Sequence, residues 1–381
     1  YWDLGLPDTR IVELLQAHFD TSVYGLSLST FRRMRRTWGF LTTRKQKHTP
    51  ESIAENVAKV KQRFPNMGAR SMVVTLRQDY GIRVPERVVA EYLKAVESNA
   101  VASRKGRNFK RRVFYAAGVN DVWAVDQHDK WQKFGLYLHV GVDPFPGDIL
   151  WLRIWWTNRN PRLVTSYYLD AASNRGGICL VTQSDPGTEN YGIANCHTTI
   201  RHQLDQSLVG TLQHRFMRKK SNIKPEIMWS VIRRTWSEGF ESILQYGVLN
   251  GLYDPSNTIE KLTFLWLAVP WLQAELDLFS HRFNTSKHRS DKHKVTPQGI
   301  PQLIATRPEI YGARDYKIVI PPDMLAEARQ QWAPPDDPVF QLTPPAFDYV
   351  AQQEYAQLGS PVVNGNSFWT IYVQLLHGIR N

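Results

Sequence analysis

The chain has 381 residues, long enough for two or three domains, and 42% of them are hydrophobic, as in an ordinary folded protein. The chain has only two cysteines, which excludes a disulfide-stabilised scaffold and fits a reducing compartment. No apolar run approaches the ~20 residues of a membrane span, so we expect neither a transmembrane segment nor a secretory leader. The formal charge is +12, and the whole excess lies in residues 1–119, with 22 Lys and Arg against 10 Asp and Glu.

This uneven charge predicts a basic arm for a polyanion ahead of a neutral body with another task. Residues 9–39 predict two helices separated by a break at Gly25, and Ser27 or Ser29 is expected to cap the second helix. We expect its inward side chains to be Phe31, Met34 and Trp38. We expect its outward side chains to be Arg32, Arg33, Arg35 and Arg36. A short basic helix after such a turn is typical of a helix-turn-helix that contacts DNA, and a solvated basic face is the alternative.

A second helical segment follows at residues 51–98. Its apolar side chains recur at helical spacing and predict three helices: Ile53, Val57, Val60, Met72, Leu76, Val88, Val89 and Leu93. Gly81 is expected to end the second of these helices, and Pro85 to open the third. The segment again resembles a helix-turn-helix of transposases. We therefore predict a helix-turn-helix over residues 1–48 and a second, helix-turn-helix-like domain over residues 49–102.

The densest positive stretch falls in a predicted linker over residues 103–118. Its cations, together with two from the segment between the helical domains, are predicted to bind DNA: Lys45, Lys47, Arg104, Lys105, Arg107, Lys110, Arg111 and Arg112. Such runs neutralise phosphates, and they also serve as nuclear import signals. The two roles are compatible, and we expect a nuclear protein.

From residue 120 the hydrophobic pattern changes to strands alternating with helices. The expected strands are 121–127, 136–143, 149–157, 177–183 and 211–218, and the expected helices are 160–173, 189–204 and 225–250. A turn at residues 145–148 should make the second and third strands antiparallel, and the later helices should connect parallel strands. The sequence thus predicts an α/β fold with a mixed five-stranded sheet in the order βββαβαβα, preceded by all-α units.

Three carboxylates stand where local structure has no evident use for them. Asp126 closes an apolar run that predicts a buried strand, where a lone charge would be costly. Asp185 follows a second apolar strand, and Glu226 lies in the first turn of an amphipathic helix directly after Pro225, a residue accepted at the first helical position. Two strands and a helix can bring these acids to one point.

The motifs around these acids are Trp123-Ala124-Val125-Asp126, the run Ser184–Asn190, and Asn222-x-x-x-Glu226-x-x-Trp229. In this order they resemble the integrase core domain of the DDE superfamily, which includes retroviral integrases and cut-and-paste transposases, and above all integrase-like proteins of fungal and animal genomes. The resemblance implies a ribonuclease H-like fold with the three acids in one cleft. It also implies a catalytic core over residues 119–255, followed by a helical extension with a basic loop over residues 256–310.

Hard carboxylate ligands without His or Cys favour Mg²⁺ or Mn²⁺, and we predict two ions held by Asp126, Asp185 and Glu226. Such a pair would catalyse phosphodiester cleavage with water and strand transfer with a DNA 3′-hydroxyl. Arg233, seven residues after Glu226, lies on nearly the same helix face, and the resemblance implies that it contacts DNA phosphate. Two further acids lie nearby, Asp129 and Glu189, and we expect both to pair with neighbouring residues.

The remaining chain predicts less. Residues 260–283 form a helix that is apolar nearly all round, buried against the core or in a subunit interface and kinked at Pro270. Residues 311–381 are a Pro-rich, acidic region of unknown function, which we expect to be extended over 315–354. We predict a DNA integrase or transposase that binds double-stranded DNA as a homo-oligomer, without a membrane. The alternatives are a domesticated, catalytically silent DNA-binding protein and a ribonuclease H-type nuclease.

Overall fold

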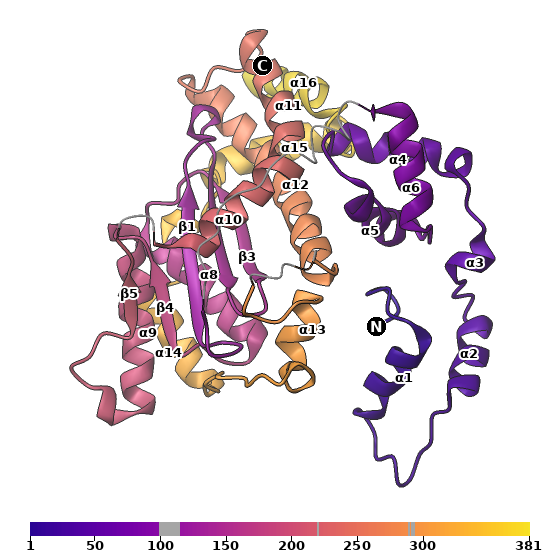
Figure 1. Ribbon diagram of the computed structural model, residues 1–381. Coiled ribbons are helices and arrows are strands. Elements are labelled where there is room, and N and C mark those ends of the chain that lie inside the picture. The colour runs from indigo at the N-terminus through magenta and orange to yellow at the C-terminus, as the bar shows by residue number, and fades with distance from the viewer. Residues whose placement is uncertain (99–114, 219–220, 289, 291–293) are drawn as a thin grey trace. The chain divides into compact units, whose positions relative to one another are not determined.

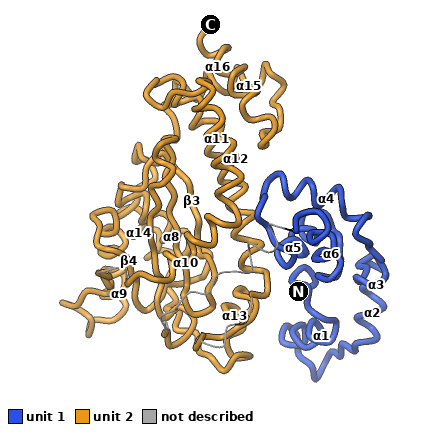
Figure 2. The backbone as a smooth tube through the Cα atoms, turned by 45° about the horizontal axis from the view of Figure 1, so that its top comes forward, with its two compact units in different colours: residues 1–111 blue, residues 112–381 orange. Residues whose placement is uncertain are grey.

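The computed structural model describes residues 1–98, 115–218, 221–288, 290 and 294–381. The chain forms two compact units, residues 1–111 and residues 112–381 (Figure 2). Each unit has its own core, and each is described by itself. The cations of the predicted linker lie outside the described residues: Arg104, Lys105, Arg107, Lys110, Arg111 and Arg112.

The first unit begins with the expected pair of helices, α1 (Asp8–Gln16) and α2 (Leu28–Thr37), followed by the short α3 (Thr43–Gln46). Ser27 is the N-cap of α2, and its side chain accepts a hydrogen bond from the amide of Thr30. Buried Ile11 and Phe31 belong to the small core between the two helices. Residues 17–27, which connect α1 and α2, are longer than the turn of three or four residues in a helix-turn-helix.

Three further helices complete this unit: α4 (Pro50–Arg63), α5 (Ala69–Tyr80) and α6 (Glu86–Val96). Their apolar faces are buried as the spacing predicts, and Ile53, Leu76 and Val89 are fully enclosed. Gly81 ends α5 with a φ of 67°, a left-handed conformation that glycine adopts without strain. Gln46 in α3 accepts a hydrogen bond from the amide of Arg83 at 2.6 Å, which ties the first helices to this group.

Two predictions about α2 are wrong. Arg35 is buried rather than exposed: its guanidinium lies 5.0 Å from the centre of the Trp2 ring and donates to the carbonyl of Phe40 at 2.6 Å. Met34 and Trp38, which were expected to face inward, are 38% and 54% exposed. Trp2 takes the inner position because an arginine stacks well on an indole ring.

The second unit is built on a mixed five-stranded sheet, as the sequence predicts. The strands are β1 (Val122–His128), β2 (Tyr137–Asp143), β3 (Asp148–Trp155), β4 (Val181–Ser184) and β5 (His214–Phe216). Their order across the sheet is β3-β2-β1-β4-β5, with β1–β2 and β2–β3 antiparallel and β1–β4 and β4–β5 parallel. Figure 1 shows this sheet with helices around it. It is the sheet of a ribonuclease H-like fold.

Helices cover both faces of the sheet. They are α8 (Pro161–Arg175), α9 (Tyr191–Leu204), α10 (Ile223–Ile232) and α11 (Glu238–Leu249), the last two joined by a π-helical turn over Arg233–Ser237. Trp123 and Val125 of β1 are buried in one core with α8 and α9. Since side chains alternate along a strand, Ala124 and Asp126 face the other side, where α10 packs on β1 and β2.

Edge strand β3 is covered by the long helix α12 (Thr258–Thr285). Gln273 accepts from the amide of Ile154 and donates to a carbonyl of β3, and Asn284 does the same for both backbone groups of Ile149. These side chains satisfy the free edge of the sheet. Helix α12 has the length and apolar composition needed to cross a membrane, and it alone has them among the described residues. It packs on β3 and on the C-terminal helix, as the core helix of a folded domain does. It continues as one helix through Pro270.

The C-terminal region is helical, not extended as predicted. It contains α13 (Pro301–Thr306), α14 (Pro322–Trp332), α15 (Pro345–Gln357) and α16 (Phe368–Arg380). Helix α14 packs on α8 and α9, and α16 packs on α12 and α15. Each of these helices except α16 begins at a proline, which suits the first helical position because its missing N–H has no intrahelical partner there. The prolines therefore start helices rather than extend the chain.

Candidate active site

Asp126 lies near the end of the central strand β1, on the face that α10 covers. Four consecutive residues before it are buried, Val122 to Val125, and Asp126 itself is half-buried. The indole nitrogen of Trp229 in α10 donates a hydrogen bond to Asp126 Oδ2 at 3.0 Å. This bond fixes one carboxylate oxygen and joins the helix to the strand end.

Asp185 directly follows β4, the parallel neighbour of β1. In the β1–β4 ladder Val122 is opposite Val181 and Ala124 is opposite Gln183, a separation of 59 positions in both pairs. Asp126 and Asp185 are also separated by 59 positions. The same register, continued past the end of β4, therefore places the two aspartates at the same level at the carboxyl ends of neighbouring strands.

Glu226 lies in the first turn of α10, as predicted, and is half-buried. The helix begins at Ile223, so Pro225 is its third residue rather than its first. Trp229, which bonds to Asp126, is one turn further along the same helix. Glu226 therefore lies on the helix that Trp229 holds against β1.

Asn222, the residue before α10, connects all three elements. It is fully buried, its Nδ2 donates to the carbonyl of Val125 at 2.8 Å, and its Oδ1 accepts from Gln183 Nε2 at 3.1 Å. Val125 precedes Asp126, and Gln183 lies two residues before Asp185. Although Asn222 belongs to the motif of the sequence analysis, its role was missed, because a partner 97 residues away leaves no local pattern.

The pKa of Asp126 is shifted by burial and by the two other acids. Burial, together with the negative charges of Asp185 and, to a smaller extent, Glu226, raises the pKa of Asp126 to about 7, although the bond from Trp229 lowers it. Burial also raises the pKa of Asp185. The charges of both neighbouring acids therefore act on Asp126.

In their present positions, no three His, Cys, Asp or Glu side chains of the described residues form a group that could hold a metal ion. Without a cation between them, ionised carboxylates repel one another, so the three acids are not expected to approach to metal-binding distances. The chemistry of the donors does fit a hard cation: Asp185 Oδ1 is buried and, within the described chain, accepts no hydrogen bond. The role of Asp126, Asp185 and Glu226 as metal ligands stays a prediction.

The two other acids near the site are bound to neighbours, as expected. Glu189 is buried and accepts hydrogen bonds from Gln127 and from Asn190, the latter at 3.2 Å. Asp129 is exposed and accepts from Asn158 at 2.7 Å. These contacts explain both residues as structural acids. Through its bond to Glu189, Gln127, which directly follows Asp126, contacts the segment that follows Asp185.

Arg233 is exposed at the end of α10, where the π-helical turn begins. His128 stacks on Trp229 with ring centres 4.7 Å apart. Burial lowers the pKa of His128 to about 4, and the positive charges of Lys130 and Arg233 contribute. A cation on this helix thus lies near the residues that contact Asp126, and π-helical turns are frequent at functional sites.

The predicted DNA contacts of the first unit divide into two groups. Arg33, Arg36, Lys45 and Lys47 are exposed. Arg32 is exposed but pairs with Asp8, with 3.3 Å between Nε and Oδ2, and Arg35 is buried. Only the first group presents free faces suited to phosphate without rearrangement.

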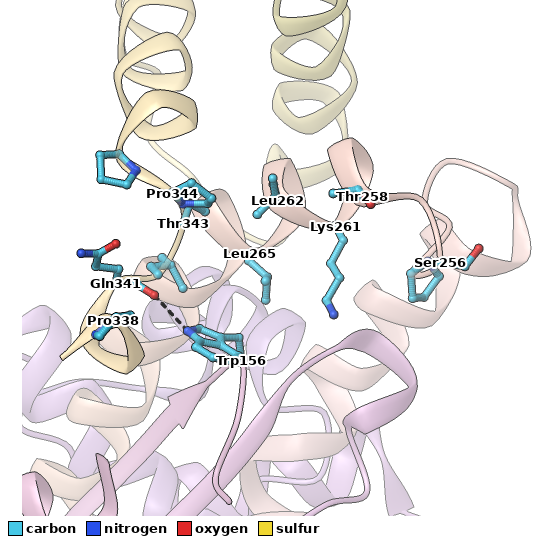
Figure 3. A pocket seen from close by; sticks show the side chains of 13 residues that line it. Trp156, Ser256, Thr258, Lys261, Leu262, Leu265, Pro338, Gln341, Thr343 and Pro344 are labelled. Atoms are coloured by element: carbon cyan, nitrogen blue, oxygen red, sulfur yellow. Dashed lines mark hydrogen bonds between the residues drawn. The ribbon is translucent and has the colours of Figure 1, made fainter. Parts of the chain in front are cut away.

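Two cavities of the second unit are lined by other residues. One, of about 520 Å³, lies between the start of α12 and residues 338–345, with Lys261 pointing into it (Figure 3). There Trp156 donates to the carbonyl of Gln341 at 3.0 Å. The other, of about 460 Å³, includes Asp148 and Arg175 in its wall. Neither contains any of the three acids.

Comparison with known proteins agrees with the fold. Residues 113–304 match the family described as integrase core domain, and this match spans all five strands and the three acids. No curated protein matches the sequence. On this match and on the sheet order, the chain belongs to the integrase core domain family.

Proposed function

We propose that this protein cuts and joins DNA as a metal-dependent integrase or transposase, with Asp126, Asp185 and Glu226 as its catalytic acids. The observation that carries the proposal is the position of the acids. Two of them follow the same register on neighbouring parallel strands, and Trp229 bonds the helix of the third to the first. The integrase core family supports a polynucleotidyl transferase.

The three acids would hold Mg²⁺ or Mn²⁺, and two such ions supply an activated attacking oxygen and stabilise the leaving oxygen of a phosphodiester. The chain's own groups arrange the site for this. Trp229 occupies Asp126 Oδ2 and orients that carboxylate, and Asn222 holds the start of α10 against both strands. Exposed Arg233 adds positive charge where a DNA phosphate would approach.

Double-stranded DNA is the proposed partner, because the exposed cations of the first unit and the charge excess of residues 1–119 favour a polyanion. We also propose a homo-oligomer that acts in the nucleus. The basic run of residues 104–112 supports the location, because such runs are typical of nuclear import signals.

The test is a cleavage and joining assay with full-length protein, Mn²⁺ and a duplex that carries the ends of the element encoding it. Asp126→Asn should lower the rate by more than ~100-fold, because the amide removes the charge that attracts cations while it keeps the shape. Asp129→Asn is the matched control, since this nearby acid is exposed and bound to Asn158, and it should keep the rate.

Other outcomes identify the alternatives. DNA binding without cleavage by the unchanged protein would indicate a catalytically silent DNA-binding protein. Cleavage without joining would indicate a ribonuclease H-type nuclease. Equal activity of Asp126→Asn and the unchanged protein would contradict the proposed site.

A further inference from the structure

Helix α2 and the residues after it present an apolar patch that the unit does not bury. The patch consists of Met34, Trp38, Phe40 and Leu41, which are 38%, 54%, 42% and 48% exposed. Met34 and Trp38 lie one turn apart, and the Trp38 and Phe40 rings meet edge to face with centres 6.0 Å apart. Large exposed aromatic side chains that gather in this way indicate a binding surface.

The patch rests on a firm base. The Phe40 ring stacks on Trp2 at 5.7 Å between centres, with 11° between the planes. Trp2 is in turn held by Arg83, whose guanidinium lies 3.7 Å from the ring centre and donates to the Trp2 carbonyl. Buried Arg35 fixes the carbonyl of Phe40. The exposed ring of Trp38 therefore stands at the end of an ordered aromatic row, so little conformational freedom is lost on binding.

The charge around the patch identifies its occupant. Residues 21–50 contain seven Lys and Arg and no Asp or Glu. Among these cations Arg33, Arg36, Arg44 and Lys45 are exposed. Aromatic faces beside several exposed cations fit nucleic acid, since the cations neutralise phosphates and the rings stack on bases. Inside a regular duplex each base face is covered by the neighbouring base pair, so an aromatic side chain stacks on bases mainly where the strand is unpaired.

We infer that Trp38, supported by Phe40, is a stacking site for unpaired nucleobases of DNA. The inference rests on the proposed DNA function and deepens it. The cations of α2 would bind the phosphates of the DNA backbone, while the aromatic patch would select distorted or open DNA. Removing one base–aromatic stack is expected to weaken binding about 5- to 150-fold. Such a site would favour DNA whose ends have been opened.

The experiment measures binding of full-length protein to two labelled duplexes by fluorescence anisotropy, one fully paired and one with a bubble of mismatched bases. Trp38→Ala and Trp38→Leu should weaken binding to the bubble about 5- to 150-fold and to the paired duplex much less. Trp38→Phe should keep most of the preference, because phenylalanine still stacks. Tyr246→Ala is the matched control, an equally exposed aromatic (56%) on α11, and it should change nothing.

Salt dependence separates stacking from charge. Trp38→Ala should leave the slope of log K against log salt unchanged, whereas Arg33→Ala with Arg36→Ala should make it shallower. The inference is overturned if Trp38→Ala binds the bubble duplex as tightly as the unchanged protein does. It is also overturned if the variant loses the same factor in affinity for both duplexes. A changed oligomeric state with unchanged DNA affinity would also overturn it and assign the patch to a protein contact. Failure of the unchanged protein to bind either duplex would instead refute the proposed DNA function.

Discussion

Asp126 is held in a protonation state that depends on its neighbours. Its pKa rises to about 7 because the side chain is buried and because Asp185 and Glu226 place negative charge nearby. The folded protein without divalent ions therefore binds a proton there that the unfolded chain releases near pH 4. Ionisation of Asp126 at neutral pH costs folding free energy, and a bound cation would offset this cost.

This predicts how Asp126→Asn changes stability. The amide can still accept the bond from Trp229, but it has no charge to bury. In EDTA the variant should match the unchanged protein below about pH 4, where the carboxyl is protonated in both states. Its advantage should grow from pH 4 to 7 and level off above, reaching at most about 4 kcal/mol, since each unit of pKa difference between the folded and unfolded states contributes about 1.4 kcal/mol. Urea unfolding across this pH range measures it.

If the difference in free energy of unfolding between the variant and the unchanged protein were the same at all pH values, the pKa of Asp126 would not be raised in the folded protein. Asp129→Asn, which changes an exposed acid directly after β1, controls for the loss of a negative charge and should show no such trend.

At the scale of elements, Asn222 positions α10 against the two strands that carry the aspartates. Asn222→Ala leaves the buried Val125 carbonyl and the Gln183 amide without their partner, which should lower the free energy of unfolding by about 1–3 kcal/mol. Cleavage should fall further than stability explains, because Glu226 and Trp229 move with the helix. Denaturant unfolding and the cleavage rate, measured on the same preparation, test both effects.

Asn250→Ala is the matched control for Asn222→Ala. Asn250 is exposed, and its Nδ2 donates only to the carbonyl of Tyr246 one turn earlier, so this change should cost less than about 0.5 kcal/mol. Equal effects of the two substitutions would mean that Asn222 has no special role in placing α10.

Most elements could be predicted from the sequence because their hydrophobic periods are strong. The apolar run of β1 and the spacing of Ile53, Val57 and Val60 leave little choice of structure. The C-terminal helices could not be predicted, because prolines at their first positions look like breaks in an extended chain. Arg35 was misplaced for another reason: its partner Trp2 is 33 positions away, and helical spacing alone does not show a stacking contact. The same limit hid the bonds of Asn222.

At the scale of the whole molecule, the positive charge excess and the proposed catalytic acids lie in different parts of the chain. The positive excess belongs to residues 1–119, while residues 120–381 have no net charge and carry all three acids. DNA binding and catalysis should therefore be separable by substitution. Changes at Arg33 and Arg36 should weaken DNA binding, and changes at the acids should stop cleavage with binding intact.

The central claim is that the three acids form one metal site, and Mn²⁺ binding to the full-length protein tests it most directly. Free Mn²⁺, followed by electron paramagnetic resonance during titration, should show up to two bound ions per chain. Asp126→Asn, Asp185→Asn and Glu226→Gln should each weaken binding at least ~10-fold, and Asp129→Asn should not. Mn²⁺ binding that is unchanged in Asp126→Asn, or that is lost only in Asp129→Asn, would contradict the account.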